Sequence, residues 1–116
     1  MTTDSTTKIR ELNDLCRKAM GVAGRVVQTQ GISALPPDVQ SAIREKVELF
    51  ADFTPDNDPH GEHDFGAFDF KGERIFWKID YYDRASFGTG HDYGSENPAD
   101  PATTLRVLTI MLASEY

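Results

Sequence analysis

Cysteine and long apolar stretches are nearly absent from this sequence of 116 residues. Its one cysteine, Cys16, excludes an internal disulfide framework, and such sparse use of cysteine is typical of the reducing cytoplasm. No apolar run approaches the roughly 18 residues that span a bilayer, and the N-terminus has no signal-peptide core. We therefore expect a cytoplasmic protein with no membrane partner.

Basic side chains are scarce in the middle of the chain. The net charge is −7, and residues 52–100 contain twelve acidic and four basic side chains, whereas residues 1–51 contain six acidic and seven basic ones. Affinity for nucleic acid comes chiefly from Lys and Arg side chains that displace counterions from phosphates. We therefore expect no direct binding of nucleic acid, because a basic protein surface or a cation suits this region better.

The N-terminal half predicts two helices and a short strand within a single domain, residues 1–116. Residues 1–5 are expected to be a disordered polar start. From about Thr6 to Met20, apolar side chains at helical spacing predict an amphipathic helix with Arg10, Asp14 and Arg17 on its solvent side. Residues 25–30 predict a strand. The second helix begins at Pro36-Pro37-Asp38, and its buried side comprises Val39, Ile43, Val47 and Phe50.

A β-hairpin is the central feature of the second half. Two alternating runs flank Lys71-Gly72, and a two-residue loop there places Gly66 opposite Trp77 on the core face. If the same register is extended, His63 lies opposite Asp80 on the other face, which we expect to be the working surface. An ordinary solvated sheet face is the alternative interpretation.

The remaining segments are a long loop and a third helix. Residues 84–100 are rich in glycine and predict either a lid over a site or a plain surface loop. Asp100-Pro101 is typical of a helix start, and the apolar residues from Leu105 to Leu112 predict the most buried helix. The expected fold is α+β, in the order α-β-α-β-β-α, with three helices on one face of a three-stranded antiparallel sheet made of the short strand and the hairpin.

Three blocks of the sequence resemble a known family. They are NDPHGEHDFG at 57–66, FWKIDYYD at 76–83 and TLRVLTIMLA at 104–113. Together they are similar to the small bacterial proteins known as the domain-of-unknown-function 3768 family. The resemblance implies no assigned activity and no catalytic residues. It does suggest an association with plasmids and other mobile elements.

A metal-dependent hydrolase is one functional hypothesis. His60, His63 and Asp80 supply two imidazoles and a carboxylate, the donor set of a hydrolytic zinc or iron centre, and His91 could contribute from the loop. Without a metal, His63 and Asp80 could act as an acid–base pair. Turn formation by the Asp and Asn side chains of 54–64 is the competing interpretation. No nucleophile motif and no phosphate loop is present, and no cofactor is implied.

The preferred hypothesis is a non-enzymatic acidic module that binds a basic protein partner. One form of it is an inhibitor of a nucleic-acid-handling defence enzyme, of the anti-CRISPR or anti-restriction type, in which carboxylates occupy a site made for phosphates. Aromatic side chains would add contact area. The sequence gives no indication of the oligomeric state. The expected binding residues are Asp58, Glu62, Asp64, Phe76, Asp80, Tyr81, Tyr82 and Asp83.

Overall fold

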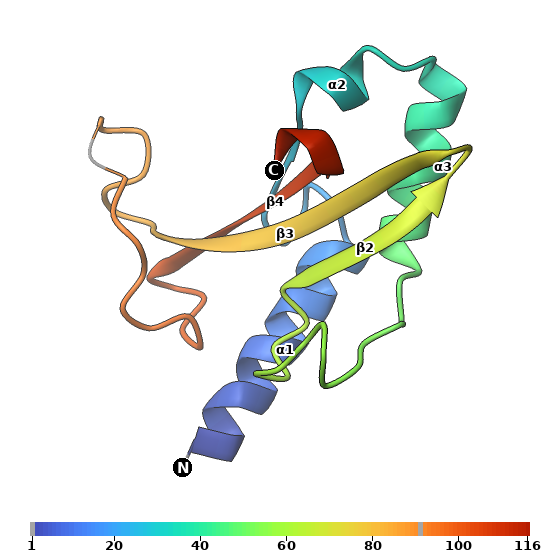
Figure 1. The fold of residues 1–116 in the computed structure, drawn as a ribbon. Helices are drawn as coiled ribbons and strands as arrows, with labels where there is room; N and C mark the ends of the chain where they lie inside the picture. Colours follow the sequence, from blue (N-terminus) through green and yellow to red (C-terminus); the bar gives the residue numbers. More distant parts are fainter. Residues whose placement is uncertain (1, 91) are drawn as a thin grey trace.

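The computed structural model describes residues 2–90 and 92–116, so His91 lies outside the described part of the chain. The α+β class is confirmed (Figure 1). No helix in the described ranges is long and apolar enough to cross a membrane. The elements in chain order are α1 (Thr2–Lys18), β1 (Arg25–Gln28), α2 (Gln30–Ser33), α3 (Pro37–Glu48), β2 (Phe65–Phe70), β3 (Glu73–Asp83), β4 (Thr104–Leu112) and the 3₁₀ helix η1 (Ala113–Glu115).

The sheet has four strands in the order β1-β4-β3-β2, and its strands are not all antiparallel. β2, β3 and β4 pair antiparallel, whereas β1 runs parallel to β4. The prediction of a three-stranded antiparallel sheet is therefore wrong in strand number and in the placement of β1. The short strand does not join the hairpin, because β4 lies between them.

The segment predicted as the last helix is the strand β4. Its side chains are buried on both faces of the sheet, with Leu108 and Ile110 at 0% exposure on one side and Val107 and Met111 at 7% and 3% on the other. A strand covered on both faces has a nearly continuous apolar sequence, which periodicity cannot distinguish from a buried helix. Asp100, which was predicted to cap a helix, instead stabilises a turn. Its Oδ1 accepts a hydrogen bond from the Ala102 N–H at 2.9 Å.

The predicted hairpin is confirmed in its turn and in its register. Gly66 pairs with Trp77 and Phe68 with Ile75. Lys71 and Gly72 both have positive φ, 51° and 83°, which is the geometry of a type I′ turn. Trp77 is fully buried, and a Cβ on Gly66 would approach its indole more closely than real Cβ atoms do. The side of the hairpin that carries the tryptophan therefore faces the core.

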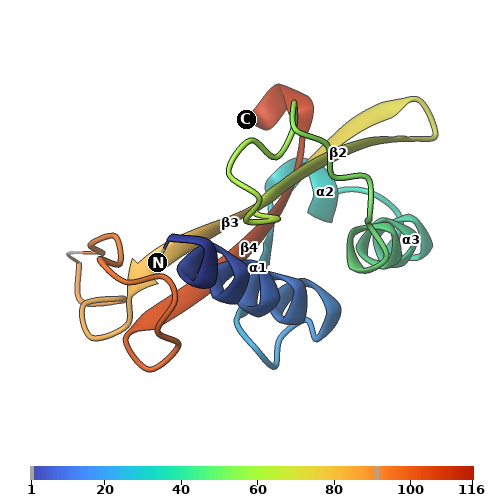
Figure 2. The ribbon, with the colours of Figure 1, turned by 90° about the horizontal axis from the view of Figure 1, so that it is seen from below.

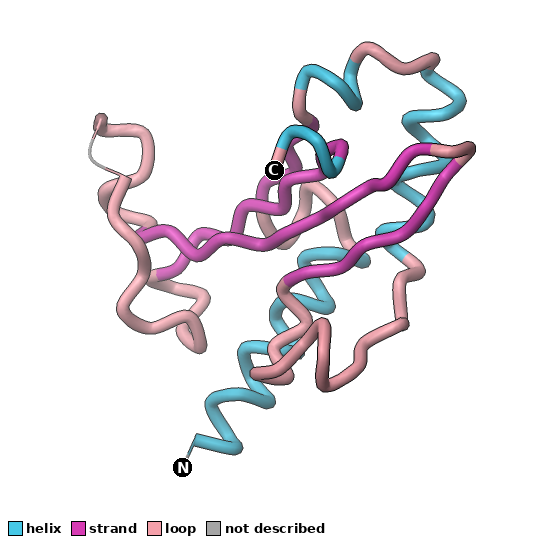
Figure 3. Tube along the Cα trace, in the orientation of Figure 1, coloured by secondary structure: helices cyan, strands magenta, loops and turns pink. Residues whose placement is uncertain are grey.

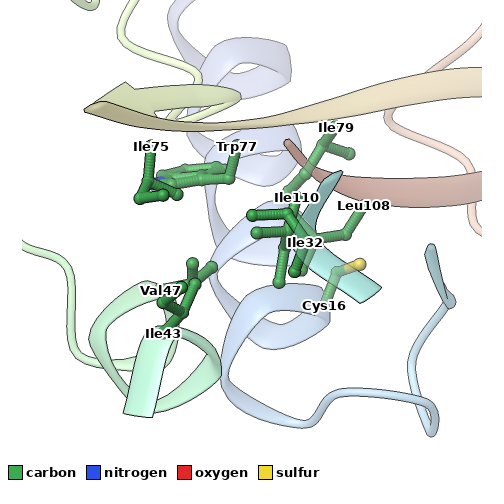
Figure 4. Close-up of a cluster of buried hydrophobic side chains, with 9 residues drawn as sticks. All are labelled: Cys16, Ile32, Ile43, Val47, Ile75, Trp77, Ile79, Leu108 and Ile110. Atoms are coloured by element: carbon green, nitrogen blue, oxygen red, sulfur yellow. The ribbon is translucent and has the colours of Figure 1, made fainter. Parts of the chain in front are cut away.

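The core lies between this side of the sheet and the helices α1 and α3 (Figure 2). Ile75 and Trp77 point from the sheet toward Ile43 and Val47 of α3 (Figure 4). α3 begins at Pro37, as expected, and α1 begins four residues before the predicted Thr6. Residues 84–90 and 92–103 contain no helix or strand, which agrees with the long loop predicted there (Figure 3).

Candidate functional site

The turn formed by residues 54–64 is fastened to one side of α1. The Arg10 guanidinium donates to the Gly61 carbonyl at 3.1 Å, and the Asn13 amide donates to the Glu62 carbonyl at 3.0 Å. These helix residues are three positions apart, which places them on one face of α1. The turn between α3 and β2 is thus held in place by a helix distant in sequence.

His63 occupies the inner end of this turn. Its Nδ1 lies 2.9 Å from Asp14 Oδ1, its Nε2 lies 3.7 Å from Asp58 Oδ2, and its ring stacks on Phe53 with centroids 3.7 Å apart. The backbone N–H of His63 donates to Asp58 Oδ1 at 3.1 Å. Asp58 is buried, with 9% exposure, so this carboxylate organises the turn.

His63 and Asp80 do not face each other, contrary to the predicted register. His63 has a φ of 56°, in the left-handed region, and β2 begins only at Phe65. The imidazole therefore turns toward α1, on the Trp77 side of the sheet. Asp80 projects from the opposite face, where its Oδ2 accepts from the Lys78 ammonium at 3.0 Å. The proposed acid–base pair is not assembled.

The donor set of the metal-site hypothesis is not brought together either. His60 is exposed at the tip of the turn, His63 lies inside it, and Asp80 lies across the sheet. Within residues 2–90 and 92–116, no group of three His, Cys, Asp or Glu side chains is placed to hold a metal ion. The competing interpretation, turn formation by Asp and Asn, is confirmed for Asp58 and for Asn57, whose Oδ1 accepts from the Thr54 N–H at 2.9 Å.

A polar network lies beneath the turn, centred on Tyr81. Its hydroxyl donates to Glu62 Oε1 at 2.9 Å and accepts from the Asn13 amide at 2.7 Å. The Asn13 Oδ1 accepts from Arg106 Nε at 2.6 Å, and the Arg106 guanidinium also lies over the Tyr81 ring. Burial, together with Glu62, raises the pKa of Tyr81 above its usual range, although the Asn13 bond opposes this shift. Because both sides of the hydroxyl are bonded, this tyrosine positions the turn.

The predicted binding residues are divided between the two faces of the sheet. Asp58, Glu62 and Tyr81 lie on the α1 side, with Asp64 at the end of the turn. Phe76, Asp80 and Tyr82 lie on the other side, where Tyr116 packs against Phe76 and Phe87 packs against Tyr82. Asp83 accepts from the Ser86 N–H at 3.1 Å and so shapes the start of the loop. The single working surface predicted from the hairpin does not exist.

The acidic character of the turn is nevertheless pronounced. Residues 47–70 contain seven acidic side chains and no lysine or arginine. Asp52 and Asp56 are exposed, whereas Glu62 and Asp64 are half-buried. Burial raises the pKa of Asp64, and the neighbouring Glu62 carboxylate adds to this effect. We call the segment 52–64 the acidic turn.

Sequence reasoning missed the inner polar face of α1. It placed Arg10, Asp14 and Arg17 in solvent, yet Arg17 is 1% exposed, whereas Leu15, one of the apolar side chains at helical spacing, is 52% exposed. The Arg17 guanidinium donates to three carbonyls at the end of α3 and to Asp14. A signal was present, because Arg10, Asn13, Asp14 and Arg17 have the spacing of a helical stripe, but polar residues in such a stripe are ordinarily assigned to solvent.

Comparison with known proteins identifies the family. Residues 28–115 match the family model described as "Protein of unknown function (DUF3768)". The match includes the acidic turn, the hairpin and β4, and it leaves out α1. No curated protein matches the chain significantly, and no solved structure does. Since the matched segment covers most of the sequence, the chain belongs to the DUF3768 family of proteins of unknown function.

Proposed function

We propose that this protein is a non-enzymatic, cytoplasmic binding module that engages a basic protein surface through its acidic turn. One observation carries the proposal: a segment without a single lysine or arginine is fastened to α1 with its exposed carboxylates directed outward. A loop fixed before binding loses little conformational entropy when it binds. Fixed carboxylates also accelerate encounter with a basic partner.

The basic partner of the acidic turn is, in this proposal, a protein that binds nucleic acid. A basic surface that binds carboxylates also suits phosphates, because guanidinium and ammonium groups bind both kinds of oxyanion. We therefore propose that the acidic turn competes with nucleic acid for a restriction or CRISPR-type nuclease, in a protein carried by a mobile element. Asp52, Asp56 and Glu62 would take the places of phosphates.

The experiment measures inhibition of DNA cleavage by a panel of such nucleases. An inhibited nuclease is then tested with the variant Asp52→Asn/Asp56→Asn, which removes two exposed charges and keeps the side-chain shape. We expect inhibition to weaken about tenfold, since each exposed charge at an interface contributes about 0.5–1 kcal/mol. Association should also slow steeply as salt is added.

The matched control is Glu11→Gln/Glu45→Gln, which removes the same charge from exposed positions on α1 and α3. This control should inhibit like the parent protein. Inhibition that is indifferent to salt, or that both double variants weaken equally, would contradict a role for the acidic turn. An effect of salt without an effect of the Asp52/Asp56 pair would place the contact elsewhere on the molecule.

A further inference from the structure

A cavity of about 390 Å³ lies at the end of the sheet away from the hairpin turn, and three arginines line it. They come from three segments: Arg25 begins β1, Arg84 follows β3, and Arg106 lies in β4. The pairing of Asp83 with Thr104 and of Arg25 with Val107 brings these segments together. Because β1 starts only opposite Val107, the first residues of β4 form one wall of the cavity.

The cavity is positive in a protein that is otherwise strongly negative. No aspartate or glutamate is among its lining residues, although the chain has nineteen of them. Of the ion pairs that the described residues form, none involves Arg25, Arg84 or Arg106. The three guanidiniums instead meet neutral groups: the Phe87 ring for Arg25, the Pro101 and Thr104 carbonyls for Arg84, and Asn13 and the Pro98 carbonyl for Arg106.

Arg106 is the most buried of the three arginines, with an exposed fraction of 4%. Its Nε and Nη2 donate to neutral oxygens, and its Nη1 has no hydrogen-bond partner in the part of the chain that the structure describes. Burial lowers its pKa, which reflects the cost of holding this charge away from water. Arg106 therefore adds positive potential beside the cavity, and the Glu62 carboxylate balances that charge only in part.

The rest of the cavity lining is mostly apolar, which suits a ligand that also has an apolar part. Leu12 and Leu15 of α1 and Val22 of the following turn form an apolar wall, and Leu15 and Val22 are 52% and 86% exposed. Exposed apolar side chains next to a cluster of arginines suit a ligand with a charged end and an apolar end. The volume lies within the range of small-molecule sites, roughly 300–1,000 Å³.

We propose that this cavity binds a small organic oxyanion, a phosphate or a carboxylate that carries a compact apolar group. Guanidinium groups bind both oxyanions in a bidentate manner, and we assign Arg25 and Arg84 as the donors, since the strand register puts Arg25 and Arg106 on opposite faces of the sheet. The leucine and valine wall covers the apolar group. This site shares no lining residue with the acidic turn, and it does not depend on the function proposed above.

The test is calorimetric titration of the full chain at constant ionic strength with phenyl phosphate, benzoate and inorganic phosphate. We expect saturable binding of phenyl phosphate, of benzoate, or of both, and weaker binding of inorganic phosphate. Preference between the first two identifies the oxyanion as phosphate or carboxylate. Equal affinity for inorganic phosphate and phenyl phosphate would overturn the role of the apolar wall, and no saturable binding of any probe up to about 10 mM would overturn the site.

Variants separate this cavity from a general effect of charge. Arg25→Gln and Arg84→Gln should each weaken binding about tenfold, the effect of losing one charge-assisted hydrogen bond. Arg74→Gln is the matched control, since Arg74 is exposed and lies in the hairpin, where it pairs with Asp69. Weakening by Arg74→Gln equal to that by Arg25→Gln would contradict the proposal. Arg106 is left unaltered in these experiments because its side chain also holds Asn13.

Discussion

At the scale of single residues, the fit between Gly66 and Trp77 determines how the hairpin meets the core. The indole lies over the bare glycine backbone, and the ring edges of Phe50 and Phe53 pack against it. The Arg17 guanidinium lies 5.5 Å from the Trp77 ring. Four residues from three segments thus enclose one side chain, which leaves no room for an added methyl group.

The variant Gly66→Ala tests this packing. Its Cβ would overlap the indole, and overpacking of a filled core typically costs about 1–3 kcal/mol. We expect the free energy of unfolding, measured by urea denaturation, to fall by this amount. Gly94→Ala is the control, because the nearest atom to its Cβ would be 3.8 Å away. Equal losses in the two variants would show that overlap with the tryptophan does not explain the effect.

At the scale of elements, the turn-forming and helix-starting residues predicted the structure better than the spacing of apolar residues did. The type I′ turn and the start of α3 follow from Lys71-Gly72 and Pro36-Pro37, whose backbone preferences act within a few residues. β4 and the parallel pairing of β1 depend on which strand lies in the middle of the sheet, and no local pattern contains that information. The acidic turn was found from charge, but its attachment to α1 required the tertiary structure.

The orientation of α1 predicts that loss of the polar Arg17 side chain lowers stability more than loss of the apolar Leu15 side chain. The sequence pattern of α1 suggests the opposite order. Arg17→Ala removes hydrogen bonds from a charged group to the end of α3 and should lower the free energy of unfolding by about 2–4 kcal/mol. Leu15→Ala removes a half-exposed side chain and should cost about 1 kcal/mol or less. Urea denaturation of both variants measures the difference. A larger loss for Leu15→Ala would mean that the apolar stripe, not the polar one, faces the sheet.

At the scale of the whole molecule, α1 connects the two regions that carry our proposals. Its residues Arg10 and Asn13 hold the acidic turn, and its residues Leu12 and Leu15 line the arginine cavity. The network from Glu62 through Tyr81 and Asn13 to Arg106 runs between them. A change that breaks this network should therefore affect the stability of the entire fold.

Alkaline pH tests this network through Tyr81. Burial raises the pKa of Tyr81, so in the folded protein it stays neutral while the unfolded chain ionises near pH 10. The stability that the neutral hydroxyl provides is therefore complete below about pH 10 and is lost as the pH rises above it.

Tyr81→Phe should cost about 1–2 kcal/mol at pH 7, from the bonds to Asn13 and Glu62, and should flatten this alkaline loss. Urea denaturation between pH 7 and about pH 11 measures both effects, with Tyr116→Phe, which alters an exposed tyrosine, as the control. An alkaline loss equally steep in Tyr81→Phe and in the parent protein would show that another group controls it.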